Sequence, residues 1–576
     1  MSPRFLPLLL LCLPLAASGF EFSLEAPDEL RPLLQQHLEL ARAAREQEEA
    51  VGDDEVQRLL QQSERSAQAL LATEGYFSPT IITSLSGEGP DLRASLAVQP
   101  GPRTLVTRVT LRFKGDIEQD ERLPRIRTAM LNNLPLREGQ PFRQADWAAS
   151  KQAVLRPLHA LRYPAASLQS SDARIEALRH EASIELEIDS GPAFHFGELQ
   201  IEGLSRYPES IVRNLSSIGV GDAYRQQALF DLQQALSDSG YFTQAQVRID
   251  PDPALADAVP VQVEVVEQKA KRFSFGAGVN TDTGARLRSQ WQLRNLLSRG
   301  LRLTMDNEFE RPSQQGSLTL AWPRSPRGHE YSTSFQHKRE NIEGQETRGS
   351  TLGARTQQQR GRIETTLGVQ YQTESQFISD VLNERNQALT TSYTWTHKAV
   401  SRDIYPRRGY ILTAQIGGAH ELLLSDTSFG RLYMRHTQHL PIGANARLVL
   451  RGEAGGVFSN RREGIPTEFL FRAGGDNSVR GYAYQSIGRD ASGAVQSVRF
   501  LGTASVEYHH FFTRSWGAAV FVDGGDATDQ PAQFTPVFGY GTGLRYASPV
   551  GPINLDLAWG EATRRLRLHF SLGVSF

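Results

Sequence analysis

The end of the chain alternates strictly between apolar and polar residues. From Leu566 to Phe576 one parity is Leu, Leu, Phe, Leu, Val and Phe, and the other is Arg, His, Ser, Gly and Ser. A period of two is typical of a β-strand with two different faces. The run is also about as long as a strand that crosses a membrane. Because a soluble sheet with one face on a core gives the same pattern, this strand alone leaves both interpretations open.

The second half of the chain repeats this alternation in many short runs. Their polar parity is Glu, Gln, Thr, Asn, Asp and Gly, which is typical of a polar lumen, and aromatic residues collect at the ends of the runs. A sandwich of about 300 residues would be far too large for one domain. At about 19 residues per strand and turn, the sequence predicts an all-β transmembrane barrel of about 16 antiparallel strands over residues 269–576. The runs include Leu318–Trp322, Ile363–Tyr371, Leu389–Trp395, Tyr410–Ile416 and Ile553–Trp559.

The first half contains three repeats of about 85 to 90 residues, recognised by recurring landmarks. Gly75–Phe77 and Gly240–Phe242 both read Gly-Tyr-Phe after a helical pattern, and Arg162–Pro164 holds the same place in the middle copy. Helical periodicity occurs twice in each repeat, so the order is strand, helix, helix, strand, strand. This predicts three α+β domains with small sheets, whose free edges could accept another extended chain, although they could equally be stable spacers. The predicted domains are residues 20–103, 104–191 and 192–268.

The first 19 residues have the layout of a secretory signal. Arg4 precedes an apolar run from Phe5 to Leu15, and small residues follow at Ala17 and Gly19. Cys12 is the only cysteine, so we expect neither disulfides nor thiolate metal sites in the mature chain. After Gly19 no apolar stretch approaches the roughly 18 residues of a spanning helix, which leaves a closed barrel as the way to sit in a membrane.

Bulk charge and motif searches exclude several functions. The net charge of −2 gives no reason to expect nucleic acid as a partner. No Gly-x-Ser-x-Gly turn, His-Glu-x-x-His helix or phosphate-binding loop is present in the sequence. His509 and His510 are adjacent, so in a strand they point to opposite faces and cannot chelate one ion. We therefore predict no catalytic residue, no metal site and no cofactor, and we do not expect an enzyme.

One segment is too rich in glycine and charge for a strand and too apolar for an exposed tip. It runs from Phe471 to Asp490 and contains Val479-Arg480-Gly481-Tyr482. This tetrapeptide resembles the sixth outer loop of the POTRA-plus-β-barrel superfamily, which includes BamA, TamA and the two-partner secretion transporters. Other stretches resemble the same superfamily along essentially the whole mature chain. They are Phe521–Gly525, Gly541–Tyr546, Ser548–Pro552 with Asp556, Asn295-Leu296 with Gly300, and Tyr405–Gly409.

The resemblance implies a location and an internal lock. It places the barrel in a bacterial outer membrane and the three α+β domains, as POTRA domains, in the periplasm. It also implies that the loop carrying Val479, Arg480, Gly481 and Tyr482 folds back into the barrel. There Arg480 would meet Asp523 and Glu507 on the inner wall, and a planar guanidinium can form paired hydrogen bonds with such carboxylates. Removing one partner of a buried pair costs about 3 to 5 kcal/mol.

The number of POTRA-like domains points to a subgroup of the superfamily. Three domains resemble TamA-type members, whereas BamA is expected to carry five and the secretion transporters two. The resemblance therefore implies an assembly factor that inserts autotransporters and other β-barrel proteins. Its implied partner is a TamB-like periplasmic protein anchored in the inner membrane, together with client outer-membrane proteins and outer-membrane lipid. The alternatives are a secretion pore for one dedicated polypeptide and a passive porin or tether.

A barrel closes only if its first strand, about Phe273 to Thr281, meets its last, Arg565 to Phe576. Both edges contain glycine, which weakens side-chain support at this seam. A seam that opens would offer a free edge to a client strand, which could add to it as a further strand. The residues that we assign to the seam and to the terminal signal are Phe273, Phe275, Gly276, Gly278, Phe570, Gly573 and Phe576.

Overall fold

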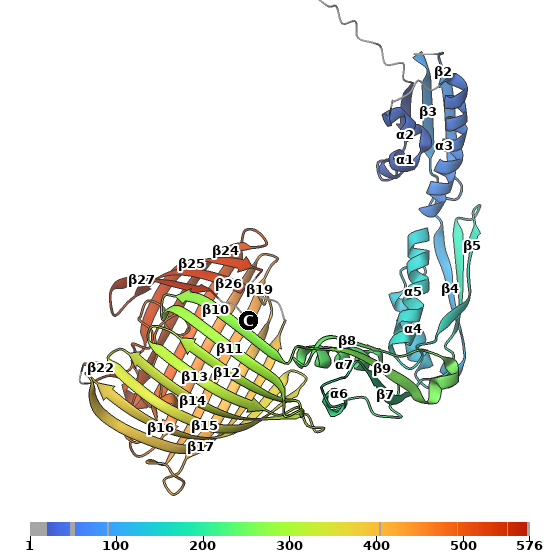
Figure 1. The fold of residues 1–576 in the computed structure, drawn as a ribbon. Coiled ribbons are helices and arrows are strands. Elements are labelled where there is room, and N and C mark those ends of the chain that lie inside the picture. Colours follow the sequence, from blue (N-terminus) through green and yellow to red (C-terminus); the bar gives the residue numbers. More distant parts are fainter. Residues whose placement is uncertain are drawn as a thin grey trace, which may run out of the picture. The chain divides into compact units, whose positions relative to one another are not determined.

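The computed structural model describes residues 20–46, 52–88, 91–401, 405–491, 493–549 and 551–572. The predicted signal at residues 1–19 lies outside the described residues, as do Gly573 and Phe576 of the predicted seam. Within these ranges the chain forms three small three-stranded sheets, followed by one sheet of sixteen strands and a two-stranded ribbon (Figure 1).

Along the chain, each small domain has the order strand, helices, strand, strand. Within its sheet, the last strand lies in the centre. The three sheet orders are β1-β3-β2, β4-β6-β5 and β7-β9-β8. The first contains β1 (Glu21–Glu25), α1 (Arg31–His37), α2 (Glu39–Glu46), α3 (Asp53–Thr73), β2 (Thr80–Ser86) and β3 (Arg93–Gln99). The second contains β4 (Leu105–Lys114), α4 (Leu123–Asn133), α5 (Gln144–Ala160), β5 (Ser167–Glu176) and β6 (Glu181–Asp189). The third contains β7 (Phe196–Glu202), α6 (Ser210–Leu215), α7 (Gln226–Asp238), β8 (Phe242–Arg248) and β9 (Val259–Glu267).

The helices cover one face of each sheet because their apolar residues lie on one stripe. In the second sheet, Val154 and Leu158 of α5 belong to the same buried cluster as Ile184 and Leu186 of β6. The outer strands keep an edge with no strand beside it, since β1 and β2 each pair only with β3 in this sheet. No helix among the described residues has both the length and the apolar character needed to cross a membrane.

The repeated landmarks mark a tight turn after the long helix of each repeat. Gly75, Arg162 and Gly240 all have positive φ angles, of 92°, 63° and 74°. A side chain is strained in this region of backbone space, which favours glycine at two of the three turns. At Gly75 a Cβ would also lie 2.2 Å from the carbonyl oxygen of Phe142, so a larger residue could not fit without movement.

The remaining residues form the barrel, which confirms the predicted fold of sixteen antiparallel strands. Its strands run in sequence order, with β10 and β27 at the two ends of the sheet. They are β10 (Lys271–Asn280), β11 (Gly284–Leu296), β12 (Leu301–Phe309), β13 (Ser313–Ala321), β14 (His329–Ile342), β15 (Gln345–Arg360), β16 (Ile363–Ile378), β17 (Val381–Val400), β18 (Gly409–Ala419), β19 (Phe429–Ile442), β20 (Ala446–Phe458), β23 (Phe500–Phe511), β24 (Trp516–Thr528), β25 (Val537–Ser548), β26 (Gly551–Gly560) and β27 (Arg565–Leu572).

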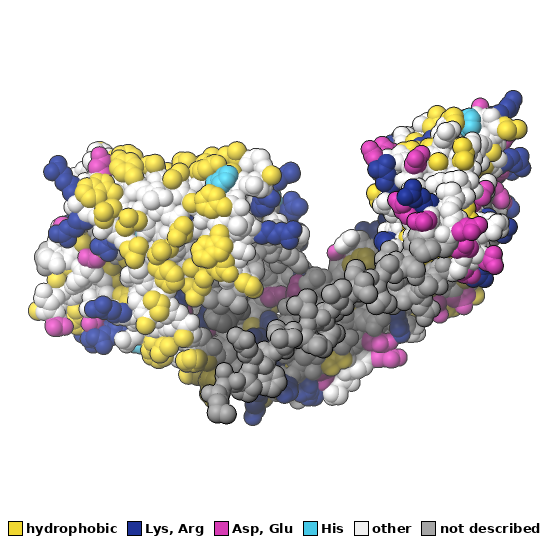
Figure 2. Space-filling view, turned by 90° about the horizontal axis from the view of Figure 1, so that it is seen from above, with side chains coloured by type: hydrophobic (Ala, Val, Ile, Leu, Met, Phe, Trp, Pro, Cys, Tyr) yellow, Lys and Arg dark blue, Asp and Glu magenta, His cyan; other side chains and the backbone are white. Residues whose placement is uncertain are grey.

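The alternation in the sequence becomes an apolar outer face and a polar inner face. In β27, Leu566 and Leu568 are 63% and 53% exposed, whereas His569 on the other parity is 2% exposed. Hydrophobic side chains gather on the outside of the barrel, where Figure 2 shows them over much of the visible wall. An exposed apolar band of this kind suits a bilayer, because lipid and not water then covers it.

A cluster of hydrogen bonds joins the segment after β7 to the start of the turn between β11 and β12 of the barrel. Glu267 accepts from the backbone N–H groups of Ser205, Arg206 and Tyr207 at 2.8–3.0 Å and pairs with the Arg206 guanidinium at 2.8 Å. Asn295 then donates to the Arg206 carbonyl at 2.7 Å. Burial alone would raise the pKa of Glu267, but these hydrogen bonds outweigh it and lower the pKa to about 2.

This pKa predicts how the hydrogen bonds between Glu267 and residues 205–207 respond to acid. A carboxylate whose pKa is depressed on folding stabilises the folded state above its unfolded pKa, and that stability is lost as the pH falls through the folded value. For Glu267 the window runs from about 4.5 down to about 2, and the full contribution is about 3 kcal/mol. We expect Glu267→Gln to speed amide exchange at Arg206 and Tyr207 strongly at pH 6. The difference from wild type, corrected for intrinsic exchange rates, should disappear near pH 2; a difference independent of pH would contradict this assignment.

Candidate functional site: the inner loop and its arginine

The long loop between β20 and β23, residues 459–499, lies inside the barrel; we call it the inner loop. Its Thr467 hydroxyl donates to Glu374 of β16 at 2.6 Å, and Arg472 donates to Gln345 of β15. Its Phe471 and Val498 exchange two backbone hydrogen bonds and belong to an apolar cluster with residues of the wall. The loop also carries the ribbon of β21 (Arg489–Ala491) and β22 (Ala494–Gln496). Because it contacts strands on several sides of the barrel, the loop occupies the lumen.

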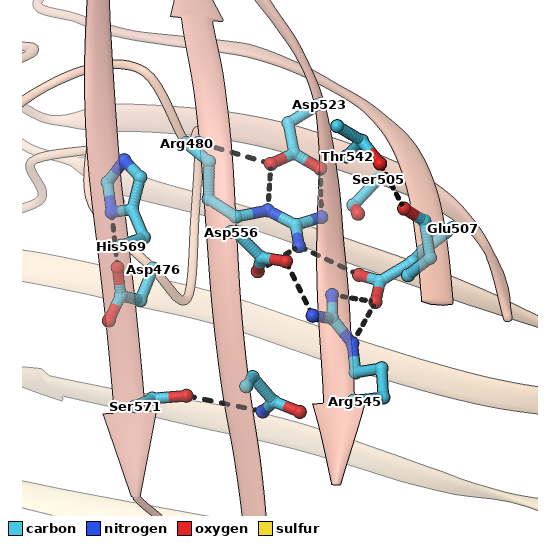
Figure 3. A network of polar contacts seen from close by, with 12 residues as sticks. Asp476, Arg480, Ser505, Glu507, Asp523, Thr542, Arg545, Asp556, His569 and Ser571 are labelled. Carbon is cyan, nitrogen blue, oxygen red and sulfur yellow. Dashed lines mark hydrogen bonds and ion pairs between the residues drawn. The ribbon is translucent and has the colours of Figure 1, made fainter. Parts of the chain in front are cut away.

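Arg480 is the best-connected charged group of this loop, and it is 3% exposed. Its Nε and Nη2 donate to the two oxygens of Asp523 at 2.7 and 2.9 Å, and its own backbone N–H donates to Asp523 at 3.1 Å (Figure 3). Its Nη1 lies 2.9 Å from Glu507 and 3.0 Å from Asp556. The Phe521 ring faces the guanidinium, with its centroid 3.3 Å from Cζ. The structure thus brings together Arg480, Asp523 and Glu507, which the sequence analysis assigned to one site.

Two further residues of the site, Arg545 and Asp556, belong to stretches of the sequence that resemble the superfamily, but sequence reasoning assigned them no role. Arg545 of β25 lies 2.5 Å from Glu507 and 2.5 Å from Asp556, so it joins the two carboxylates from the side away from Arg480 (Figure 3). Asp556 of β26 is shared by both arginines. The signal in the sequence was their parity, because both alternate with outward-facing residues such as Leu544 and Leu557. Parity shows that a side chain points into the lumen, but it does not give the position along the barrel axis or the neighbouring side chains.

Charge balance explains why so many ionised groups can be buried together. Arg451 of β20 lies 3.9 Å from Asp523 and 4.0 Å from Glu507. Three guanidinium groups therefore face three carboxylates. Burying a charge is costly unless it is paired and hydrogen bonded, and a balanced network meets that condition. The participants are Arg451, Arg480, Arg545, Glu507, Asp523 and Asp556.

The backbone on either side of Arg480 lies directly on the wall. A Cβ at Gly539 of β25 would lie 1.9 Å from the Arg480 carbonyl oxygen, and one at Gly560 of β26 would lie 2.6 Å from that of Gly481. Gly481 itself has a φ of 94°, which disfavours any side chain. Next to it, the Tyr482 hydroxyl donates to the Phe538 carbonyl at 3.1 Å and accepts from the Ala562 N–H at 3.0 Å. The loop is therefore positioned by its backbone as well as by charge.

Two of the residues assigned to the seam face the lipid side of β10. Phe273 and Phe275 are 58% and 63% exposed, whereas Gly276 and Gly278 lie on the other, less exposed parity of the same strand. On β27, the Phe570 carbonyl accepts a hydrogen bond from the Thr281 N–H at 3.3 Å, and the Phe570 N–H donates to the Thr281 hydroxyl at 2.9 Å. Where both edges are described, the two strands meet at this point.

The fold and the site define a class of protein: a membrane barrel whose lumen holds an arginine-bearing loop, preceded by small α+β domains. Residues 266–576, more than half of the chain, match the Omp85 superfamily domain. Residues 194–268 match the POTRA family, described as a surface antigen variable number repeat. The chain belongs to the Omp85 superfamily. With its POTRA domain, the barrel is an outer-membrane protein whose POTRA part lies in the periplasm.

Similar sequences and folds occur in bacterial outer-membrane proteins and in a chloroplast envelope protein. The structure of BamA from Haemophilus ducreyi lacking POTRA domains 1-3 matches with a TM-score of 0.66 and 16% identity, over 82% of this chain and 100% of that one. CdiB from Escherichia coli matches with a TM-score of 0.47 and 13% identity, over 95% and 98% of the two chains. The chloroplastic outer envelope protein 80 of Oryza sativa subsp. japonica is 30% identical over 34% of this chain, which spans only 30% of the length of that relative.

The geometry around Arg480 predicts unequal coupling to its acids. In Arg480→Ala, Glu507 and Asp556 keep Arg545 as a partner, whereas Asp523 keeps only Arg451 at 3.9 Å. A carboxylate stranded in this way costs about 3 to 5 kcal/mol. We therefore expect a double-mutant cycle of Arg480→Ala with Asp523→Ala to show a larger coupling energy than one with Glu507→Ala. Urea unfolding in lipid vesicles measures both cycles, and equal coupling energies would show that the arginine is held by the network as a whole.

Proposed function

We propose that this protein is an outer-membrane assembly factor that inserts autotransporters and other β-barrel proteins. The observation that carries the proposal is the position of the locked inner loop, which is bonded to β24, β26 and β27 beside the seam between the first and last strands. Membership of the Omp85 superfamily and a BamA-like barrel fold support the same role. Insertion requires a sheet that can receive a new strand, and a seam that opens between the first and last strands would provide one.

The mechanism follows from the two edges of the sheet. Opening the seam would expose the backbone groups of β10 and β27, and a client strand could pair with one edge by β-augmentation. The client would then leave by completing its own barrel, because a closed barrel has no unpaired edge. No phosphate-binding motif was found in the sequence, so the free energy would come from folding of the client in lipid.

The three small α+β units would serve as binding sites for partners before insertion. We propose that all three are POTRA domains, over residues 20–103, 104–191 and 192–268. Their outer strands, such as β2 and β5, have an edge without a neighbouring strand in their sheets. Such edges can hold an extended client or a partner by strand addition. Three domains support a TamA-like protein with a TamB-like inner-membrane-anchored partner, which would dock on these edges or at the barrel.

A secretion pore for one dedicated polypeptide is the alternative from the sequence. In that case the client would pass through the lumen and not the seam. The inner loop fills part of the lumen and contacts β15, β16, β24 and β26, so transport would require its withdrawal. A test that locks the seam and leaves the loop untouched separates the two routes.

The test is a disulfide across the seam in a chain whose only native cysteine is Cys12. Thr281→Cys with Phe570→Cys joins the positions at which β10 and β27 hydrogen bond. We expect oxidation to reduce assembly of an autotransporter client at least about tenfold, and reduction of the disulfide to restore it, since the edges could no longer separate. Surface exposure of the client passenger domain in cells measures assembly.

The matched control joins two strands that are already paired. Ser289→Cys with Asn307→Cys links register partners of β11 and β12, so its oxidation should leave assembly unchanged. Full assembly with the seam locked would contradict lateral opening. If secretion of a dedicated partner also continued with the seam locked but ceased when the loop was cross-linked in the lumen, the pore would be the better account.

A further inference from the structure

The described residues of the seam show fewer strand-to-strand hydrogen bonds than the other strand pairs of the barrel. Neighbouring strands elsewhere share continuous ladders, such as the sixteen register pairs between β15 and β16. Between β10 and β27 no ladder is formed by the described residues, and the two strands end the sheet order. One backbone hydrogen bond of 3.3 Å and one side-chain hydrogen bond of 2.9 Å join Thr281 to Phe570. Besides these bonds, the inner loop contacts both edges.

Three side chains from separate segments meet beside this seam. Asp282 lies in the turn between β10 and β11, Asp476 lies in the inner loop, and His569 lies in β27 (Figure 3 labels the last two). The Asp476 N–H donates to an oxygen of Asp282 at 2.8 Å, and His569 Nδ1 hydrogen bonds Asp476. The second Asp282 oxygen lies 3.7 Å from the same Nδ1. The loop thus contacts one edge through Asp282 and the other through His569.

The contacts are buried and tightly fitted. The side chains of Asp282, Asp476 and His569 are 7%, 11% and 2% exposed. Gly475, which precedes Asp476, has a φ of 97°, and a Cβ there would lie 2.5 Å from an Asp282 oxygen. Glycine at this position is therefore required for the close approach of the turn to the loop.

The hydrogen bonds fix which ring nitrogen of His569 carries the proton. The Gly481 N–H donates to Nε2 at 3.0 Å, so Nε2 is an acceptor. The proton of a neutral ring must then lie on Nδ1, where it points at Asp476. The three groups offer ligand atoms within 4.8 Å of one another, but an Nδ1 that bears a proton has no lone pair for a metal ion. This arrangement favours a hydrogen-bonded link over a metal site.

We propose that Asp282, Asp476 and His569 form a clasp through which the inner loop holds the two edges of the barrel together. Its last link continues to Gly481, next to Arg480, so release of the arginine would also loosen the seam. Asp556, a member of the arginine network, is the register partner of His569 on the neighbouring strand. The clasp rests on these contacts alone, whereas its role in admitting a client strand rests on the proposed function.

The clasp is tested by hydrogen exchange of the full-length protein in lipid vesicles without any client. His569→Gln can keep an acceptor for Gly481 but loses the donor to Asp476. We expect the amides of β10 and β27 to exchange about tenfold faster or more, as the loss of a hydrogen bond to a charged group predicts, while β14 to β16 keep their rates. His569→Asn, which keeps a donor near the position of Nδ1, should recover much of the protection at the seam.

Two controls make the result decisive. His337→Gln removes a histidine on the outward-facing parity of β14, away from the seam and bonded to Ser350 of the neighbouring strand, and should leave the seam unchanged. Asp282→Ala breaks the clasp from a turn, so it gives the same comparison if His569→Gln does not fold. Wild-type exchange at the seam in Asp282→Ala, or equal acceleration in β14 to β16, would overturn the clasp. Faster seam exchange with unchanged client assembly would keep the clasp and contradict the proposed function.

Discussion

The structure depends on a buried guanidinium that must be surrounded by carboxylates. Arg480 reaches the barrel wall only if the inner loop folds into the lumen. Its buried charge is stable there only where carboxylates pair with it. Glu507, Asp523 and Asp556 come from β23, β24 and β26, so a single side chain links three strands of the wall. The position of the loop follows from this requirement, and the glycines of β25 and β26 that receive its backbone follow in turn.

The inner loop takes part in the closure of this barrel. In a barrel closed by strand pairing alone, only the hydrogen bonds between the first and last strands would hold the two edges together. Here the loop connects the turn after β10 to β27 through a few side chains. A sheet held in this way can open at one place while its other ladders remain intact. That property suits a protein whose proposed task is to receive the strands of others.

The sequence was sufficient for the fold because a period of two is a local property. Alternation located the barrel, its strand number and the inward parity of residues such as His569. The resemblance around Val479–Tyr482 identified Arg480 and two of its acids. Arg545 and Asp556 were not assigned to the site from the sequence. Parity does not show which inward-facing residues lie at the same level of the barrel, because that depends on the register of β25 and β26. Asp282 and Asp476 were missed because they lie outside strands, where no period orients a side chain.

The central claim is that Arg480 holds the inner loop in the lumen, and the accessibility of its neighbour tests it most directly. Val479 is fully buried, and Leu422 in an outer loop is 86% exposed. With Arg480 present, Val479→Cys should react with a water-soluble maleimide far more slowly than Leu422→Cys does. Adding Arg480→Ala should bring the two rates close together, because the loop would leave the lumen. If Val479→Cys stays protected without the arginine, the loop is held by packing alone and the account is wrong.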